Sequence, residues 1–328
     1  MVAVARQKDF STIDSAEFAA DALAGLRATP KRMSPKYFYD AEGSQLFETI
    51  TQTPEYYPTR AEMEALHLHA KDLAALIPEG AALVEFGSGS SRKARVLLAA
   101  APPLACYVPV DISPEMLEQE AAALRRDVSG LNVLPVVADF TKPFALPKEA
   151  VEAPARVGFF PGSTIGNFEP HEAATFLRHA GEQLGSNAVM IVGVDLVKDA
   201  GTLTAAYNDR QGVTAAFNLN LLKRMNRELG ANFQLDHFEH HAVFNRERSR
   251  IEMHLASLVR QKVRIAGEIV DFRAGETIHT ENSYKYSVAS FGALARGTGW
   301  APVAAFTDGA GLFSIQTFRR IPALRQDA

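Results

Sequence analysis

The sequence contains one cysteine among 328 residues, so it can form no disulfide within the chain and no cluster of thiolate metal ligands. That residue, Cys106, lies in the apolar stretch "ACYVPVD", where we expect a buried core thiol rather than a nucleophile. Apolar runs of about 18 residues are missing too, and the N-terminal "MVAVARQKDFSTIDSAEF" lacks the apolar region of a signal peptide. We therefore expect a cytoplasmic protein without membrane association.

A large excess of charge of either sign is also missing, because 34 lysines and arginines stand against 38 aspartates and glutamates. The two signs are mixed along the chain, so no basic face for nucleic acid or anionic lipid is expected. A small molecule is the expected partner. With 47% hydrophobic residues, the chain can bury one large core or two modest ones.

The middle of the chain alternates short apolar runs with amphipathic stretches. Runs with the length of a buried strand lie at residues 81–87, 105–111, 132–140, 156–162 and 187–196. Helical stretches that start with serine or acidic residues follow three of these runs, at 90–100, 113–128 and 169–185. Strands separated by helices of this length predict right-handed βαβ units, and therefore an α/β fold with a doubly wound, mostly parallel sheet.

After about residue 198 the pattern changes. A long helix is expected over residues 205–230, and antiparallel strands are expected over 238–272, with a turn near Asn245–Ser249. A helix at 287–299 then precedes a strand pair at 300–318, with Asp308 and Gly309 in its turn. The regular alternation of strand and helix therefore ends near residue 198.

The loop "GSGSSR" follows the first apolar run. In a doubly wound sheet the ligand binds at the carboxyl ends of the strands, where Gly87 and Gly89 permit a tight turn and close approach of backbone to ligand. The loop is not a nucleotide P-loop, because Lys93 is not followed by serine or threonine. Nor is it a dinucleotide fingerprint, because Arg92 stands where the third glycine is needed. S-adenosylmethionine, which has no pyrophosphate, suits this loop.

Two acidic residues at the next strand ends support S-adenosylmethionine as the cofactor. Asp111 ends "YVPVD" and lies 24 residues after Gly87, close to the roughly 20 residues expected for an acid that binds ribose. Asp139 ends the run at 132–140, where it can bind an adenine amino group. The competing interpretation is that these acids cap helices and that the glycines only form a turn.

A metal centre is not expected. His237, His240 and His241 in "DHFEHHAVF" fit neither H-E-x-x-H nor another ligand spacing. If this segment is a strand, His240 and His241 point to opposite faces and cannot share a site. Methyl transfer from a sulfonium also needs no metal, because the protein mainly has to hold a neutral nucleophile in line with the S–CH₃ bond and exclude water.

Specific motifs extend along nearly the whole chain. They are "KYFYDAEGSQLFETITQTPEYYPTRAE" at 36–62, "LVEFGSGSSRKARVLL", "FFPGSTIGNF", "VGVDLVKD", "GVTAAFNLNLLKRMNREL", "RIEM" and "TENSYKYS". In these motifs the chain resembles the histidine Nα-methyltransferases of ergothioneine biosynthesis, and the motif at 36–62 is the most specific. The resemblance implies three successive methylations of the α-amine of L-histidine to the betaine hercynine. Each would consume one S-adenosylmethionine and release S-adenosylhomocysteine.

The resemblance also implies a division into two domains. A class I, Rossmann-like methyltransferase domain would comprise residues 61–197 and 285–328 and bind the cofactor. A second, α+β domain would comprise residues 1–60 and 198–284 and bind the substrate. We expect the chain to act as a monomer.

The family's cofactor contacts, carried over position by position, fall at the loop and the strand ends. They include Gly87, Gly89, Asp111 and Asp139, which the pattern of strands already indicates. The resemblance adds five further residues, which are Tyr39, Lys93, Phe140, Gly162 and Ser163. Lys93 would contact the carboxylate of the cofactor.

The backbone atoms of the amino acid substrate would be held by three residues. The resemblance assigns Tyr39 of "FYD" and Asn167 of "STIGNF" to the amino group, and Tyr207 of "AAYND" to the carboxylate. Tyr39 and Asn167 can orient the amine by hydrogen bonds without competing as nucleophiles, so they are the expected catalytic pair.

The imidazole ring would be held by Glu281 and Ser283 of "TENS" and flanked by Tyr56 of "PEYYPTR", with Met253 of "RIEM" in the same pocket. A carboxylate and a hydroxyl can address both ring nitrogens at once. An amino acid without a ring N–H would leave buried polar groups unpaired and would be rejected.

Three alternatives stay open from sequence. The first alternative is an N-methyltransferase of another aromatic amino acid, such as tryptophan or a derivative. It stays open because Asn282 and the residues "YKYS" depart from the actinobacterial pattern around Ser283. A nucleotide-dependent oxidoreductase would share the sheet but requires the third glycine. A non-catalytic cofactor-binding protein would keep the glycine loop and lose the polar substrate set, which is present here.

Overall fold

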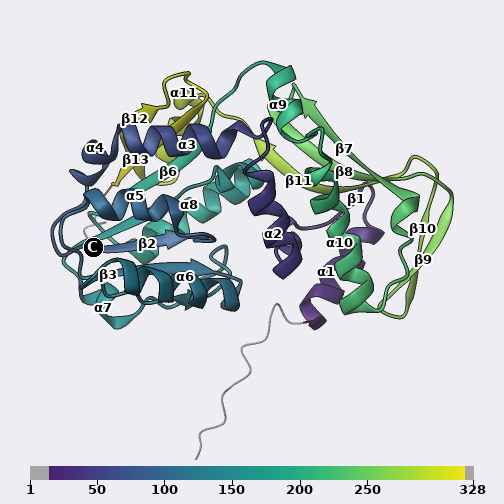
Figure 1. Cartoon of the computed structure of the whole chain (residues 1–328), viewed down its shortest axis with the longest axis horizontal. Helices are drawn as coiled ribbons and strands as arrows, with labels where there is room; N and C mark the ends of the chain where they lie inside the picture. Colours follow the sequence, from purple (N-terminus) through teal and green to yellow (C-terminus); the bar gives the residue numbers. More distant parts are fainter. Residues whose placement is uncertain (1–14, 322–328) are drawn as a thin grey trace, which may run out of the picture.

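Two lobes, each built on its own sheet, make up residues 15–321, which are the residues that the computed structural model describes (Figure 1). Residues 1–14 of the predicted substrate domain and 322–328 of the predicted cofactor domain lie outside the described residues. Within residues 15–321, no helix combines the length and the apolar character needed to cross a membrane.

The first lobe contains a seven-stranded sheet in the order β12-β13-β6-β5-β2-β3-β4. Its strands are β2 (Ala82–Phe86), β3 (Cys106–Asp111), β4 (Val136–Val137), β5 (Arg156–Phe160), β6 (Val189–Asp195), β12 (Trp300–Thr307) and β13 (Phe313–Arg320). Strands β2 to β6 are parallel, and β13 and β12 add an antiparallel edge. The strand order reverses at β2, which confirms the predicted doubly wound, mostly parallel sheet.

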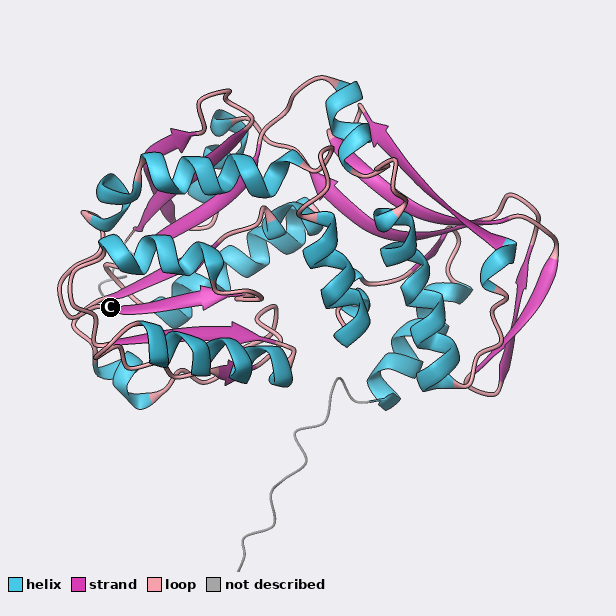
Figure 2. Ribbon diagram, in the orientation of Figure 1, coloured by secondary structure: helices cyan, strands magenta, loops and turns pink. Residues whose placement is uncertain are grey.

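Helices cover both faces of this sheet (Figure 2). One face is covered by α3 (Tyr57–Leu68), α4 (Ala70–Ala74), α5 (Arg92–Ala100) and α6 (Pro114–Asp127). The other is covered by α7 (Lys148–Glu152), α8 (Pro170–Leu184) and α11 (Val288–Arg296). Alternate strand residues enter the two cores, since Val84 packs on one face and Leu83 on the other. Cys106 is fully buried, as predicted.

The second lobe contains a four-stranded sheet in the order β1-β11-β8-β7 and a separate hairpin, β9-β10. Its strands are β1 (Lys31–Arg32), β7 (Phe238–Asn245), β8 (Arg250–Ser257), β9 (Gln261–Ile265), β10 (Glu268–Phe272) and β11 (Thr277–Tyr284). Its helices are α1 (Ser15–Arg27), α2 (Ala41–Ile50), α9 (Ala200–Ala206) and α10 (Val213–Leu229), with 3₁₀ turns η1 (Pro35–Phe38) and η3 (Leu235–His237). The turn predicted near Asn245–Ser249 joins β7 to β8.

Two sequence predictions are wrong in detail. The helix expected over 205–230 is broken, because the Asp209 carboxylate accepts hydrogen bonds from the backbone N–H groups of Val213 and Thr214 and starts α10 anew. The strand expected over 132–140 shrinks to Val136–Val137 at the edge of the sheet. Pro135 has no N–H to donate to a longer ladder.

The two lobes meet beside the 3₁₀ turn η2 (Thr164–Asn167), which follows β5 and packs against β11. A Cβ atom at Gly166 would lie 2.8 Å from the backbone oxygen of Tyr284, so only glycine permits this approach. Beyond β11, an isolated bridge between Leu196 and Tyr286 returns the chain to the first sheet. The carboxyl ends of the parallel strands therefore face the second lobe.

Substitution of the single tryptophan, Trp300, tests how tightly the core of the first lobe is packed. Trp300 is fully buried, and its indole Nε1–H donates to the backbone oxygen of Leu177, 2.8 Å away in α8. We expect Trp300→Phe to lower the free energy of unfolding by about 1–3 kcal/mol, because it removes this hydrogen bond and leaves unfilled volume. Urea unfolding followed by circular dichroism measures the change. The matched control is V303A at an exposed position of the same strand, and equal midpoints for the two variants would contradict the assignment.

Candidate active site

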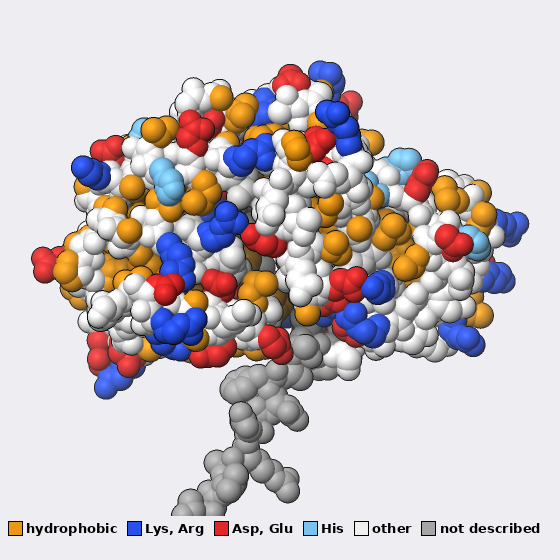
Figure 3. Space-filling view, viewed as in Figure 1, with side chains coloured by type: hydrophobic (Ala, Val, Ile, Leu, Met, Phe, Trp, Pro, Cys, Tyr) orange, Lys and Arg blue, Asp and Glu red, His pale blue; other side chains and the backbone are white. Residues whose placement is uncertain are grey.

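A cavity of about 1870 Å³ lies between the two lobes, and the space-filling view shows the molecule hollowed there (Figure 3). Every site residue expected from the sequence lines this one cavity. These residues are Tyr39, Tyr56, Gly87, Gly89, Lys93, Asp111, Asp139, Phe140, Gly162, Ser163, Asn167, Tyr207, Met253, Glu281 and Ser283. The fold thus joins the glycine loop of the first lobe to β11 of the second.

The glycine loop is held by the acid at the end of β3. Gly87 and Gly89 both have positive φ angles, of 69° and 45°, which favour glycine. The Asp111 carboxylate accepts hydrogen bonds from the backbone N–H groups of Gly89 and Ser113, both at 3.0 Å. Burial raises the pKa of Asp111 above its usual value, against these hydrogen bonds. Asp111 therefore both shapes the loop and retains free lone pairs that can accept from ribose hydroxyls.

Three further features of this end of the cavity suit a bound nucleoside. The ring of Phe140 lies close to the loop, since a Cβ at Gly87 would be 3.1 Å from it. The hydroxyl of Ser88 is buried and has no hydrogen-bond partner among residues 15–321. Asp139 accepts from the backbone N–H and the hydroxyl of Thr141, so its carboxylate also closes a local turn. An aromatic face, an acid and an unpaired hydroxyl fit S-adenosylmethionine.

Lys93 is paired with an acid that the sequence analysis did not single out. Its Nζ lies 2.6 Å from Oε2 of Glu62, which is almost fully buried. Oε1 of Glu62 accepts a hydrogen bond of 2.7 Å from the backbone N–H of Gly162. A Cβ at Gly193 would lie only 2.3 Å from the same oxygen, so the approach of this carboxylate to β6 requires glycine. Glu62 thereby fixes both Lys93 and the loop after β5.

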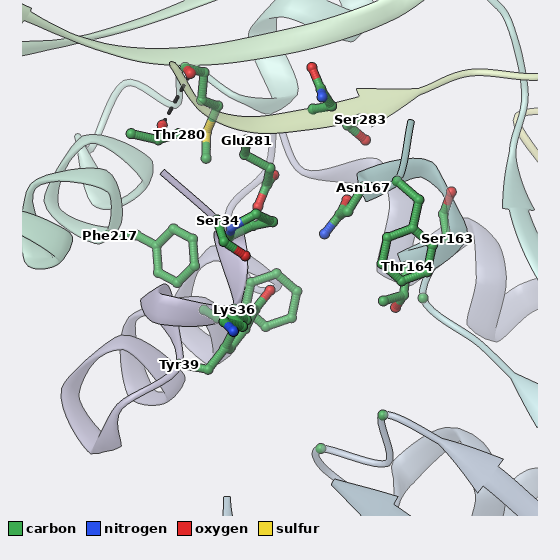
Figure 4. A pocket seen from close by; sticks show the side chains of 18 of the residues that line it. Ser34, Lys36, Tyr39, Ser163, Thr164, Asn167, Phe217, Thr280, Glu281 and Ser283 are labelled. Atoms are coloured by element: carbon green, nitrogen blue, oxygen red, sulfur yellow. Dashed lines mark hydrogen bonds between the residues drawn. The ribbon is translucent and has the colours of Figure 1, made fainter. Parts of the chain in front are cut away.

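Ser163 and Asn167 border the cavity from η2. Ser163 has a φ of 54°, a left-handed conformation that is unusual for a residue with a side chain. Its hydroxyl accepts a 3.0 Å hydrogen bond from the backbone N–H of Asp195, which holds the turn against β6. Figure 4 shows the amide of Asn167 extending into the same open space as the carboxyl group of Glu281.

Aromatic rings form one wall of the cavity. The ring of Tyr39 lies 5.8 Å from those of both Phe47 and Phe217, and the ring of Tyr56 lies 6.1 Å from that of Tyr207. Burial raises the pKa values of Tyr39, Tyr56 and Tyr207 well above the usual value for tyrosine, so these phenols stay protonated. The wall combines π faces with three hydroxyl groups.

Strand β11 presents Glu281 because of a β-bulge. The register against β8 shifts between His279 and Glu281, so Thr280 turns inward and donates to the Asn218 side chain and the Met253 backbone oxygen. Glu281 then extends toward Tyr39 and Asn167 (Figure 4). Burial raises the pKa of the Glu281 carboxyl to about 8, although Lys285 acts to lower it. Met253 is its partner in register on β8 and is buried beside it.

Behind Glu281 lies a buried ion cluster that sequence reasoning missed. The Asp195 carboxylate, at the end of β6, binds Nζ of Lys285 at 2.7 Å and Nζ of Lys198 at 2.5 Å. It also accepts from the Tyr57 hydroxyl at 2.7 Å. Burial opposes ionisation of Asp195, but the two lysines hold its pKa below the usual value. Lys285 continues toward the cavity, where it donates to Ser283.

His240 and His241 each have a hydrogen-bonding or ion-pair partner within the described chain. Asn218 donates to Nδ1 of His240 at 2.8 Å, so Nε2 of His240 carries the proton and donates to the Tyr207 backbone oxygen. His241 on the opposite side of β7 is exposed and pairs with Glu239. Among residues 15–321, no group of three or more potential ligand side chains is arranged to hold a metal ion.

Two of the neighbours of Ser283 that depart from the expected pattern, Asn282 and Tyr284, contact Glu169. The Asn282 amide donates to Glu169 at 3.2 Å, and the Tyr284 hydroxyl donates to the same carboxylate at 2.6 Å. These two residues alternate along β11 with Glu281 and Ser283, which explains why they contact a different group.

The raised pKa of Glu281 predicts a pH-dependent stability difference. Between about pH 4.5 and pH 8 the folded protein keeps a proton on Glu281 that the unfolded chain releases, so wild-type stability falls as pH rises through this window. Glu281→Gln does not titrate there. We expect the Tm of this variant to exceed that of the ligand-free wild type by an amount that increases between pH 5 and pH 8. The difference should reach roughly 4–8 °C at pH 8 and then stay constant.

Differential scanning calorimetry across this pH range gives the comparison. Glu85, whose pKa burial also raises to about 8, titrates in both proteins and cancels in the difference. A Tm difference that is constant from pH 5 to pH 8 would contradict the assignment.

Comparison with known proteins places the chain in one family. It matches histidine-specific, SAM-dependent methyltransferases over residues 18–320. It is 41% identical to a histidine N-alpha-methyltransferase of Mycobacterium tuberculosis, over 90% of this chain and 92% of that protein. It is 42% identical to one of Mycolicibacterium smegmatis, over 92% and 96% of the two chains. An ergothioneine biosynthesis protein 1 of Neurospora crassa is 32% identical, over 79% of this chain and 30% of that protein.

The family match therefore covers both sheets and all the residues that line the cavity at the glycine loop, η2 and β11. The two bacterial relatives are matched over nearly their full lengths. From this similarity, the chain belongs to the histidine-specific, SAM-dependent methyltransferase family.

Proposed function

We propose that this chain transfers three methyl groups, each from one S-adenosylmethionine, to the α-amino nitrogen of L-histidine and so forms hercynine. The observation that carries this proposal is the single cavity in which the glycine loop faces Glu281, Ser283 and Tyr207. Membership of the family supports methyl transfer and the cofactor. The polar groups on β11 support an amino acid whose ring bears two nitrogen atoms.

The residues at the first lobe's end of the cavity suit the cofactor. When bound, S-adenosylmethionine supplies an electrophilic methyl group. We propose that Gly87 and Gly89 approach it through their backbone and that Asp111 accepts from its ribose. Phe140 would contact the adenine, and Lys93 would meet the carboxylate. Asp139, Gly162, Ser163 and Tyr39 complete the proposed set.

The imidazole of the substrate would lie between β11 and the aromatic wall. The carboxyl group of Glu281 and the hydroxyl of Ser283 would each bind one ring nitrogen, while Tyr56 flanks the ring and Met253 closes the pocket. Because Glu281 is buried, a ligand without a matching polar atom would leave its carboxyl group unpaired, at a cost of about 1–3 kcal/mol.

Tyr39 and Asn167 would orient the amine. A neutral amine attacks the methyl carbon, the C–S bond breaks as the N–C bond forms, and each of the first two products must lose a proton before the next attack. The Tyr39 phenol stays protonated at neutral pH and an amide does not ionise, so neither is a base. We therefore assign these residues to positioning and expect the protons to leave to solvent.

The aromatic wall suits the product of the third transfer. A trimethylammonium group is a permanent cation, and rings such as Tyr39, Phe47 and Phe217 attract a cation over their faces by roughly 0.5–2 kcal/mol. The same rings exclude water from the reacting atoms, since Tyr39 and Phe217 face this part of the cavity together (Figure 4).

We further propose that residues 61–197 and 285–328 form the cofactor unit and that residues 1–60 and 198–284 form the substrate unit. The pairing of β1 with β11 supports this division, because it adds the N-terminal segment to the second sheet. One chain lines the whole cavity, which supports a monomer. Because both expected substrates are cytoplasmic solutes, we propose that the enzyme acts in the cytoplasm.

The proposed reaction predicts a defined product. Purified protein incubated with S-adenosylmethionine and L-histidine should convert histidine to a species carrying three added methyl groups, detected by mass spectrometry over time. Parallel incubations with tryptophan and tyrosine serve as controls and should give no methylated product. Methylation of either control, or histidine that stops at one methyl group, would overturn the substrate assignment while leaving the cofactor intact.

Replacement of Glu281 tests the imidazole subsite. We expect Glu281→Ala to raise the KM for histidine roughly 10–100-fold and to change the KM for S-adenosylmethionine by less than about twofold, because only the ring loses its partner. Initial rates over both substrate concentrations give these constants. The control is N282A, whose side chain bonds Glu169, and it should leave the histidine KM within about threefold of wild type. An unchanged KM in the Glu281 variant would refute this subsite.

A further inference from the structure

Lys285 is a buried lysine at the edge of the cavity, just beyond the end of β11, and only 3% of its surface is exposed. Its ammonium group contacts three acceptors, which are Oδ2 of Asp195 at 2.7 Å, Oγ of Ser283 at 2.8 Å and the Tyr207 hydroxyl at 3.2 Å. An ammonium group has three N–H donors and no acceptor. All three donors of Lys285 are therefore directed at named partners.

These contacts determine how the two hydroxyl groups can meet a ligand. The Tyr207 hydroxyl also donates to Oγ of Ser283 at 2.7 Å, so Ser283 accepts from both Lys285 and Tyr207. A hydroxyl has two acceptor positions and one donor. With both acceptor positions filled, Ser283 can offer only its own O–H to a ligand. If the bond between Ser283 and Tyr207 runs the other way, Tyr207 accepts twice and offers its O–H instead.

In either arrangement the pair of hydroxyls presents one outward O–H donor, because Lys285 supplies an N–H to each oxygen. When Ser283 donates to Tyr207, the Tyr207 O–H can be met only by an acceptor atom, and Ser283 keeps one acceptor position open. The backbone of an amino acid offers one strong acceptor group, its α-carboxylate, and hydrogen bonds to an ionised acceptor are stronger than those to a neutral one.

The charges around Lys285 favour an anion in the same place. Asp195 divides one negative charge between two ammonium groups, those of Lys285 and Lys198. Asp308 adds a weaker attraction at Lys198. Glu281 is a further acidic group near Lys285, and burial keeps its carboxyl group largely protonated at neutral pH. The positive charge of Lys285 is therefore incompletely balanced inside the protein, and a ligand carboxylate would complete the balance.

We propose that Lys285 is the positioning residue of a carboxylate subsite, where its hydrogen bonds to both hydroxyls let Tyr207 offer its O–H to the α-carboxylate of the substrate, leave Ser283 an acceptor position for the ring, and supply positive charge beneath the carboxylate. This inference rests on the proposed function and deepens it. Lys285 makes the site selective for a free amino acid over an amide or an amine that carries the same ring.

Lys198 provides an internal control for this role. It is also buried and binds the same Asp195 carboxylate, but its remaining contacts are the Tyr57 hydroxyl and the Leu196 backbone oxygen. Replacing either lysine with methionine leaves Asp195 with one ammonium partner. Only the Lys285 variant removes the donor that reaches Ser283 and Tyr207.

The experiment compares K285M with K198M and uses two ligands, L-histidine and L-histidinamide, whose carboxylate is replaced by a neutral amide. Isothermal titration calorimetry in the presence of S-adenosylhomocysteine gives the dissociation constants. We expect wild type and K198M to bind histidine at least about tenfold more tightly than histidinamide, and K285M to lower that ratio to within about threefold of one. Affinity for S-adenosylhomocysteine should stay within about twofold of wild type in K285M.

A ratio in K285M equal to that of wild type would overturn the proposal, as would an equal loss of the ratio in K198M. If K285M does not fold, K285Q, which removes the charge and keeps a donor, takes its place and must show the same loss. Methylation of histidine by the wild type is checked first. Its absence would refute the proposed function and this inference together, whereas activity with an unchanged ratio in the Lys285 variants would refute the inference alone.

Discussion

The buried carboxylate of Asp195 is the interaction on which the arrangement of the active site depends. It ends β6 in the first lobe and binds Tyr57 at the start of α3 and Lys285 just after β11 in the second. Its backbone N–H also donates to Ser163 in the loop after β5. Removing one partner from such a buried pair typically costs about 3–5 kcal/mol, because a charge is left without compensation. Three segments far apart in the sequence therefore converge on Asp195, and the cavity lies between them.

Glu62, five residues after Tyr57 in α3, is a second buried carboxylate that joins distant segments. Its carboxylate joins α3 to Lys93 of α5 and to the backbone N–H of Gly162, and it occupies space that any side chain at position 193 would fill. The N-terminal motif at 36–62 thus does more than supply Tyr39 and Tyr56 to the cavity. It also carries Glu62, which joins α3 to α5 and to the loop after β5 within the first lobe, and this gives a physical reason for the length of the motif.

Periodicity and topology predict the first lobe well from sequence, because its strands are short apolar runs and its ligand edge follows from strand order. They fail at Pro135, which has no N–H to extend a strand, and at Asp209, whose carboxylate caps a new helix. Gly87, Asp111 and Asp139 can be found from strand ends alone, whereas Glu281, Ser283 and Tyr207 emerge only from resemblance to a family. Lys285 and Glu62 escape both approaches, because a buried charge is defined by partners that lie dozens of residues away and leaves no local pattern. In "FYDAEG", moreover, Tyr39 lines the cavity while Asp40 caps α2 and Gly43 packs against Phe38, and sequence cannot separate these roles.

The alternation of β11 has a consequence for how substrate range can diverge in such an enzyme. Glu281, Ser283 and Lys285 occupy successive alternate positions, roughly 6–7 Å apart, so the residues proposed to bind the ring and the residue proposed to act on the α-carboxylate are adjacent but separate. A change at Glu281 or Met253 can alter the ring that is accepted without touching the group that recognises an amino acid as such. Substitutions on this one strand can therefore change which substrate side chain is accepted, while recognition of the amino acid backbone and methyl transfer to the amine are preserved.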